Sequence, residues 1–345
     1  MSVEDKSQYG RIEWIDFAKG ITIILVIIGH TVNGWIRGTI FSFHMPLFFI
    51  LSCATFKYSK SEEEFKKATI KGFKHLIIPA IMMFFLCIII SIVKNPSSVA
   101  NLKLLKEYVR IELLSLLFAS GVDVYFFDTQ IPCIGIPWFL FVLFEGRTLL
   151  DYLNLKLSSK KLIFYSLLFS IVGVILGKMF LTPFSFDIAL AIFPLLLIGK
   201  HFRVLSVEEK AGVKLLFSTV LWAVCLLITY RISYSYMELA CRRYTLYPFC
   251  FIIALLGTIM ISELGVVCYR TLPFNKPIVY LGKNSLYMLC IHILDYYLWQ
   301  WTYNWSKYDM LNAITRVMVD ILVFMVFMLT KGIYERSIRL KQKHS

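Results

Sequence analysis

Long apolar stretches alternate with short polar ones along most of this chain. A membrane-spanning helix needs about 20 consecutive apolar residues, with a range of about 17–25, and several stretches approach that length. We therefore predict an all-α, polytopic transmembrane helix bundle with about ten spans. The predicted spans lie near residues 20–36, 40–56, 76–93, 136–150, 162–181, 184–199, 213–230, 246–262, 278–299 and 311–330.

The polar segments between these stretches suggest further elements. Residues 102–119 place apolar side chains at helical spacing among charged ones, which predicts an amphipathic helix. Residues 121–135 are interpreted either as a lid over an outward-facing site or as a plain connection. Residues 57–74 are interpreted as a solvated amphipathic helix or as a cationic surface near a phosphate-rich cofactor. The aromatic residues between 299 and 305 are typical of an interfacial belt, which needs no binding role.

Composition supports a membrane protein, since 58% of residues are hydrophobic and 17% are charged. The formal net charge of +14 could suggest nucleic acid, but the distribution of basic residues argues against that partner. If the N-terminus is cytosolic, 25 of the 36 Lys and Arg residues fall on the cytosolic side. This bias predicts ten spans, both termini in the cytosol and contact with anionic membrane lipids. One integral-membrane domain is predicted over 1–345, with a core of about 11–331 and no appended soluble domain.

The eight cysteines form no CxxC pair, and most of them lie in apolar stretches. They are interpreted as small core residues, and no metal site is predicted. Cys133 and Cys241 both fall in predicted outer loops. A disulfide between them is left open, because a sequence does not give their distance.

His30 is the leading functional candidate, because it lies in the first predicted span. Ionisable residues inside a membrane are expensive and usually face a cavity or a partner. His44 lies near the outer start of the second predicted span, and at 1.5 Å per residue both histidines fall roughly 6–9 Å below the outer surface. A lone histidine is more often a satisfied core residue, but two at one depth could share a polar cavity. A neutral imidazole is the usual general base near pH 7.

Other polar residues surround the predicted spans. Thr31 and Asn33 follow His30 and can hydrogen-bond to an imidazole or to a ligand. Lys19, near the cytosolic start of the same helix, could anchor that helix or bind phosphate groups. His292 and Asp295 are three residues apart and share a helical face, so they could be a histidine and its orienting carboxylate.

Four segments together resemble the acyltransferase 3 family of integral-membrane acyltransferases, and most closely its branch of fucose 4-O-acetylases. The resemblance covers nearly the whole chain, and Lys19 and His30 match the family's basic residue and histidine separated by ten residues. Cys53 departs from the glycine that the family usually has at that position. The segments are RIEWIDFAKGITIILVIIGH (residues 11–30), FHMPLFFILS (43–52), PWFL (137–140) and LGKNSLYMLCIH (281–292).

The resemblance implies a membrane O-acyltransferase that moves an acyl group, usually acetyl, from cytosolic acyl-CoA to a hydroxyl of a cell-surface or lipid-linked carbohydrate. Acetyl-CoA would be a co-substrate, with no permanently bound cofactor, and the protein would be a multi-pass protein of the bacterial plasma membrane. The expected roles are catalysis for His30 and His44, binding of the CoA phosphates for Lys19 and Arg11, and substrate binding for Asn33, Trp138, Asn284 and His292.

Other classes of function remain open at this point. A proton-coupled transporter or flippase would use the intramembrane histidines as proton relays, although its polar residues would be spread over more spans. An enzyme that acylates a lipid head group would differ in its acceptor alone. A membrane scaffold without catalytic activity would leave His30, His44 and Lys19 without a role.

Overall fold

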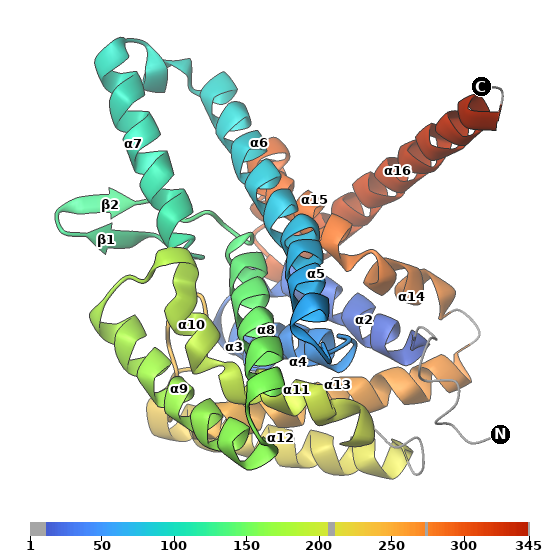
Figure 1. The fold of residues 1–345 in the computed structure, drawn as a ribbon. Helices are drawn as coiled ribbons and strands as arrows, with labels where there is room; N and C mark the ends of the chain where they lie inside the picture. The colour runs from blue at the N-terminus through green and yellow to red at the C-terminus, as the bar shows by residue number, and fades with distance from the viewer. Residues whose placement is uncertain (1–11, 206–210, 273–274, 344–345) are drawn as a thin grey trace. The chain divides into compact units, whose positions relative to one another are not determined.

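The computed structural model describes residues 12–205, 211–272 and 275–343, and most of these residues are helical (Figure 1). The all-α prediction is confirmed. The helices are α2 (Glu13–Gly29), α3 (Gly34–Phe41), α4 (His44–Ala54), α5 (Glu62–Gly72), α6 (Ile78–Lys94), α7 (Leu102–Phe118), α8 (Trp138–Lys156), α9 (Ser159–Met179), α10 (Phe186–Ala191), α11 (Phe193–Leu205), α12 (Ala211–Ser233), α13 (Phe249–Thr271), α14 (Lys276–Lys283), α15 (Ser285–Leu298) and α16 (Asp309–Lys343). Shorter elements are the π-helical turn η1 (Phe73–Ile77), the 3-10 turns η2 (Pro96–Val99), η3 (Pro183–Ser185) and η4 (Gln300–Tyr303), and the strands β1 (Val124–Phe126) and β2 (Thr129–Ile131).

The chain divides into two compact units. One lies within residues 1–37 and 273–345 and contains α2, α14, α15 and α16. The other lies within residues 38–272 and contains α4 to α13. The short helix α3 crosses the boundary between them. The prediction of one integral-membrane domain stays a prediction.

Every predicted apolar stretch falls on one or more of these helices. Among the described residues, six helical segments are long and apolar enough to cross a membrane, and a bent pair over residues 183–202 brings the number to seven. The chain is therefore a multi-pass membrane protein built from helices. The count of ten spans and the cytosolic position of both termini stay predictions.

The predicted boundaries of the first span are wrong. The helix begins earlier than predicted, at Glu13, and ends at Gly29, and α3 starts after a short turn at Gly34. Gly34 has a φ of +65°, a left-handed conformation that glycine adopts without strain and that interrupts a helix. His30 is consequently the residue that caps the C-terminal end of α2.

Helices α2 and α14 are in backbone contact because two glycines face each other across their interface. A Cβ atom added to Gly282 would lie 1.7 Å from the carbonyl oxygen of Asp16. A Cβ atom added to Gly20 would lie 2.2 Å from the carbonyl oxygen of Ile278. Small residues let membrane helices approach this closely. The close contact holds α2, and therefore its capping histidine, against the C-terminal part of the chain.

The polar segments also form helices, as the sequence suggested. Residues 57–74 supply α5, which continues through η1 into α6 as one helix of 33 residues, Glu62–Lys94. Ser61 caps α5 by accepting a hydrogen bond from the backbone N–H of Glu64. The amphipathic helix predicted at residues 102–119 is confirmed as α7, which ends at Phe118. The following segment contains the hairpin of β1 and β2, which pair antiparallel.

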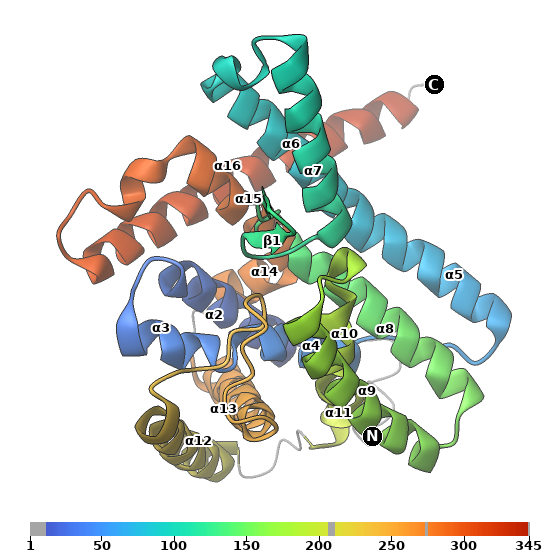
Figure 2. The same cartoon turned by 90° about the vertical axis from the view of Figure 1, so that its left-hand side faces the viewer.

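The second unit has its own buried ion pair. Nε of Arg242 donates to Asp187 over 2.9 Å, and both side chains are almost fully buried. Ser185 and Ser120 accept further bonds from the same guanidinium. This pairing accounts for an ionised carboxylate in the apolar stretch of α10. In the same unit α12 and α13 run side by side, as both views show (Figures 1 and 2).

Candidate functional site

Four ionisable side chains meet between α15 and α16. His292 and Asp295 are three residues apart on α15, and Arg316 and Asp320 are four apart on α16, so each pair shares a helical face. Each is at most 2% exposed. Charged groups are rarely buried this deeply unless they are paired, so their mutual contacts decide whether the arrangement is stable.

The contacts form one continuous network. Nδ1 of His292 lies 2.9 Å from Oδ2 of Asp295 and 3.1 Å from Oδ2 of Asp320. Arg316 donates from Nε to Oδ2 of Asp295 over 2.6 Å and from Nη2 to Oδ1 over 2.8 Å. The second contact makes the pair bidentate, which is the strong geometry for a guanidinium and a carboxylate.

Two aromatic residues next to α15 complete the network. The hydroxyl of Tyr303, in η4, donates to Oδ1 of Asp295 over 2.8 Å and also accepts a bond from Arg316. Burial raises the pKa of Tyr303 above its usual range, so the phenol stays protonated and able to donate. The indole N–H of Trp299 donates to Oδ1 of Asp320 over 3.0 Å. Each carboxylate therefore accepts bonds at both of its oxygens.

The end of α2 reaches the same network. Nη1 of Arg316 donates to the hydroxyl of Thr31 over 3.0 Å. The ring of His30 lies beside the ring of His292, with 5.5 Å between the ring centroids and an angle of 46° between the planes. His30 is exposed, whereas His292 is 2% exposed. The network thus joins an accessible imidazole to a buried one.

The carboxylates determine the proton on His292. Ionised carboxylates only accept hydrogen bonds, so Nδ1 of His292 carries a proton, and a neutral ring then has its lone pair on Nε2. Arg316 balances the charge of Asp295, and Asp320 lies against the ring of His292. A carboxylate in this position favours the positively charged form of an imidazole beside it. The arrangement is therefore suited to a base that becomes protonated during a reaction.

His292, Asp295 and Asp320 are also a possible metal-binding group, because one ligand atom from each lies within 4.8 Å of the others. Arg316, however, already donates to both oxygens of Asp295. A guanidinium in that position would repel a cation. The geometry favours an ion-pair network over a metal centre.

Several predicted site residues lie in this first unit. The structure brings His30 and His292 together. Lys19 is half-buried on α2, eleven residues before His30, which corresponds to roughly 16 Å along a helix. Asn33 donates to Asp309 over 3.1 Å, and Asn284 donates to the carbonyl of Tyr280 over 2.9 Å, where it caps α14. The predicted phosphate ligand Arg11 lies outside the described residues.

The remaining predicted site residues belong to the second unit. His44 begins α4, is 4% exposed, and has Nδ1 within 3.1 Å of the carbonyl oxygen of Ile40. Trp138 begins α8, and its ring covers Gly121 so closely that a Cβ atom there would lie 2.4 Å from it. The shared cavity of His30 and His44 stays a prediction. Cys133 is a free thiol, so the structure does not contain a disulfide between Cys133 and Cys241.

Sequence reasoning missed four members of the network: Trp299, Tyr303, Arg316 and Asp320. Arg316 is 2% exposed and lies within the candidate span Asp309–Ile338, so it is a buried charge rather than one of a polar loop. The available signal was a basic and an acidic residue four apart in an apolar stretch, which indicates a functional site by default. Trp299 and Tyr303 were assigned to an interfacial belt alone, yet each hydrogen-bonds to a buried carboxylate.

The comparisons with known proteins agree with this organisation. A family model described as "Acyltransferase domain" matches residues 12–331, which includes α2, α15 and the buried charges of α16. No curated protein matches the chain. No solved structure matches it either.

Proposed function

Because the chain belongs to the acyltransferase 3 family, and is therefore a membrane acyltransferase, we propose that it transfers an acyl group from acyl-CoA to a carbohydrate hydroxyl. Acetyl is the proposed acyl group and the bacterial plasma membrane the proposed location. The observation that carries the proposal is the contact of the exposed His30 ring with the buried His292–Asp295–Asp320 cluster. An accessible imidazole beside a fixed negative charge is what a general base for hydroxyl attack requires.

His30 is the proposed base. It takes the proton of the acceptor hydroxyl as the oxygen attacks the thioester carbonyl carbon. The carbon–sulfur bond then breaks, and the imidazolium returns the proton to the departing thiolate, so that an ester and free CoA result. The negative charge of the cluster stabilises the imidazolium while it exists.

His292 is proposed as a positioning residue rather than as the base. Its Nδ1 is held between Asp295 and Asp320, and the ring is almost fully buried. Arg316 anchors Asp295 and also holds Thr31 next to His30, so it links the cluster to the end of α2. We propose in addition that Lys19 and Arg11 bind the phosphates of CoA, at a distance that suits an extended pantetheine arm.

The test is acetyl transfer from radiolabelled acetyl-CoA by purified protein in nanodiscs, with a panel of methyl glycosides and cell-envelope lipid extract as acceptors. We expect His30→Ala to lower kcat by about 10²–10⁴-fold, the usual contribution of a general base. His201→Ala is the matched control, because His201 is an exposed histidine on α11 and should keep normal turnover.

Two results would contradict the proposal. Near-normal turnover in folded His30→Ala protein would remove His30 from the chemistry. Absence of acetyl-CoA-dependent transfer to every acceptor, by wild-type protein, would remove the proposed donor or the proposed acceptor class. Label retained on the protein without an acceptor would instead assign His30 as an acyl carrier, provided that His30→Ala abolishes it.

A further inference from the structure

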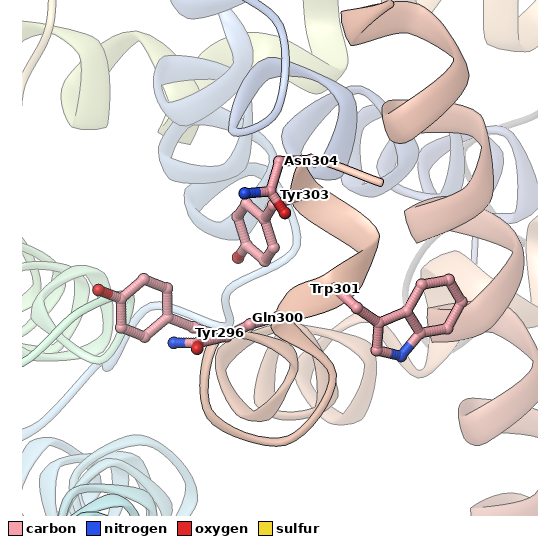
Figure 3. Close-up of a pocket in the computed structure, with 5 residues that line it drawn as sticks. All are labelled: Tyr296, Gln300, Trp301, Tyr303 and Asn304. Atoms are coloured by element: carbon pink, nitrogen blue, oxygen red, sulfur yellow. The ribbon is translucent and has the colours of Figure 1, made fainter. Parts of the chain in front are cut away.

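An open pocket of about 360 Å³ lies at the C-terminal end of α15. Figure 3 shows the rings of Tyr296 and Tyr303 with the amides of Gln300 and Asn304, while the indole of Trp301 points away from these four. The two tyrosine rings are 6.2 Å apart and nearly perpendicular. The volume lies at the lower end of the range of ~300–1,000 Å³ for small-molecule sites, which suits a ligand of one or two rings.

The lining chemistry favours a neutral, hydroxyl-rich ligand. All five lining residues are uncharged, so phosphate groups would find no cation among them. Tyr296 is 57% exposed, so a large part of its apolar ring is open to a ligand. Within the described part of the chain, the side-chain amides of Gln300 and Asn304 form no hydrogen bond, so both can donate to and accept from a ligand. An aromatic face together with amides matches the alternating C–H and hydroxyl surfaces of a sugar ring.

Tyr303 connects this pocket to the buried network of His292, Asp295, Arg316 and Asp320. It lines the pocket, and its hydroxyl donates to Asp295, which in turn accepts from His292. The guanidinium of Arg316 lies over its ring at 3.8 Å from the centroid. An interfacial belt explains exposed aromatic rings but explains neither the amides nor this connection.

We propose that this pocket binds a pyranose ring of the acceptor carbohydrate. The site rests on the proposed function for its place in a reaction, but its binding chemistry does not depend on turnover. Tyr296 stacks on the sugar ring, and Gln300 and Asn304 hydrogen-bond to its hydroxyls. Tyr303 lines the pocket on the side of the network around His292.

Saturation-transfer NMR on the full-length protein in nanodiscs tests this assignment. The probes are methyl α-L-fucopyranoside, methyl β-D-galactopyranoside and methyl N-acetyl-β-D-glucosaminide. At least one should bind saturably and receive saturation mainly on one face of its ring. Tyr296→Leu should raise its Kd roughly tenfold. The double change Gln300→Ala with Asn304→Ala should raise it roughly threefold to tenfold. Tyr308→Leu is the control, because Tyr308 is also an exposed tyrosine but does not line the pocket, and it should bind normally.

Three outcomes of the binding measurements would overturn the assignment, and a fourth comes from competition with adenosine. They are no saturable binding of any probe, an unchanged Kd in Tyr296→Leu, and an equal loss in Tyr308→Leu. Displacement of the glycoside by adenosine would also overturn it, because the pocket would then hold the base of the donor. His30→Ala should retain glycoside binding. If the protein binds the glycoside in a Tyr296-dependent way but transfers no acetyl group, the proposed function is contradicted and the pocket assignment is not.

Discussion

The change Asp320→Asn tests whether the buried cluster acts electrostatically on His30. Asp320 is the better carboxylate to change, because Asp295 binds Arg316 through both oxygens, and its loss would leave a buried guanidinium without a carboxylate partner. An asparagine at 320 can still accept the hydrogen bond from Trp299. The substitution therefore removes one negative charge with little change in volume.

The size of the expected effect follows from the distance between Asp320 and the ring of His30. The His30 and His292 ring centroids are 5.5 Å apart, and Nδ1 of His292 is 3.1 Å from Asp320, so the carboxylate lies at most about 10 Å from the His30 ring. Two unit charges 10 Å apart in an effective dielectric of 20 interact by about 1.7 kcal/mol. Loss of this stabilisation of the imidazolium should lower kcat by roughly tenfold to thirtyfold.

The pH–rate profile distinguishes this effect from simple disorder. A base that loses a neighbouring negative charge is protonated at a lower pH, because its charged form is less stable. The acidic limb of kcat/KM should therefore shift by about one pH unit toward lower pH. Glu335→Gln removes a charge from the same helix roughly 22 Å farther along, and it should leave both rate and profile unchanged. An unshifted limb together with wild-type kcat in Asp320→Asn would refute the electrostatic role.

Four further predictions follow from other parts of the molecule. Lys19→Ala should raise the KM for acyl-CoA more than it lowers kcat, and it should weaken the salt dependence of donor binding; an unchanged KM would remove Lys19 from the donor site. Gly282→Val should lower the melting temperature in detergent, because its Cβ would meet the backbone of α2, whereas Gly332→Ala, with nothing within 4 Å, should not. Arg242→Met should destabilise by about 3–5 kcal/mol by leaving Asp187 buried and unpaired, whereas Arg243→Met, at a side chain 46% exposed, should cost far less in chemical denaturation. Reporter fusions at Lys60 and Ser98 should lie on opposite sides of the membrane, and a common side would contradict the proposed order of the first three spans.

The sequence predicted the elements well because most of its information is local. Apolar stretches and helical spacing are properties of neighbouring residues, and every predicted stretch falls on a helix. Boundaries were less accurate where a turn depends on one residue, as at Gly34. His292 with Asp295 was recognisable because both lie on one face of one helix, so their spacing alone implied the contact.

The rest of the site could not be predicted because its partners come from distant segments. Thr31 and Arg316 are 285 residues apart, and His292 and Asp320 are 28 apart, on different helices. A sequence shows that Arg316 and Asp320 are expensive in an apolar helix, but it does not show which groups compensate them. The glycine contact between α2 and α14 supplies part of that answer, since it fixes the end of α2 in the unit that holds the charges.

The network also explains why these charges must be considered together. Arg316 is stable in α16 because Asp295 neutralises it, and Asp295 is oriented toward His292 by the same guanidinium and by Tyr303. Among the described residues, Asp320 has no guanidinium partner and accepts hydrogen bonds from His292 and Trp299, so it lies one imidazole away from His30. A buried charged network is seldom the most stable solution for a fold, because well-packed apolar residues in its place often leave the free energy of unfolding unchanged or raise it. An acidic side chain held next to the paired imidazoles is the arrangement that the proposed general base requires.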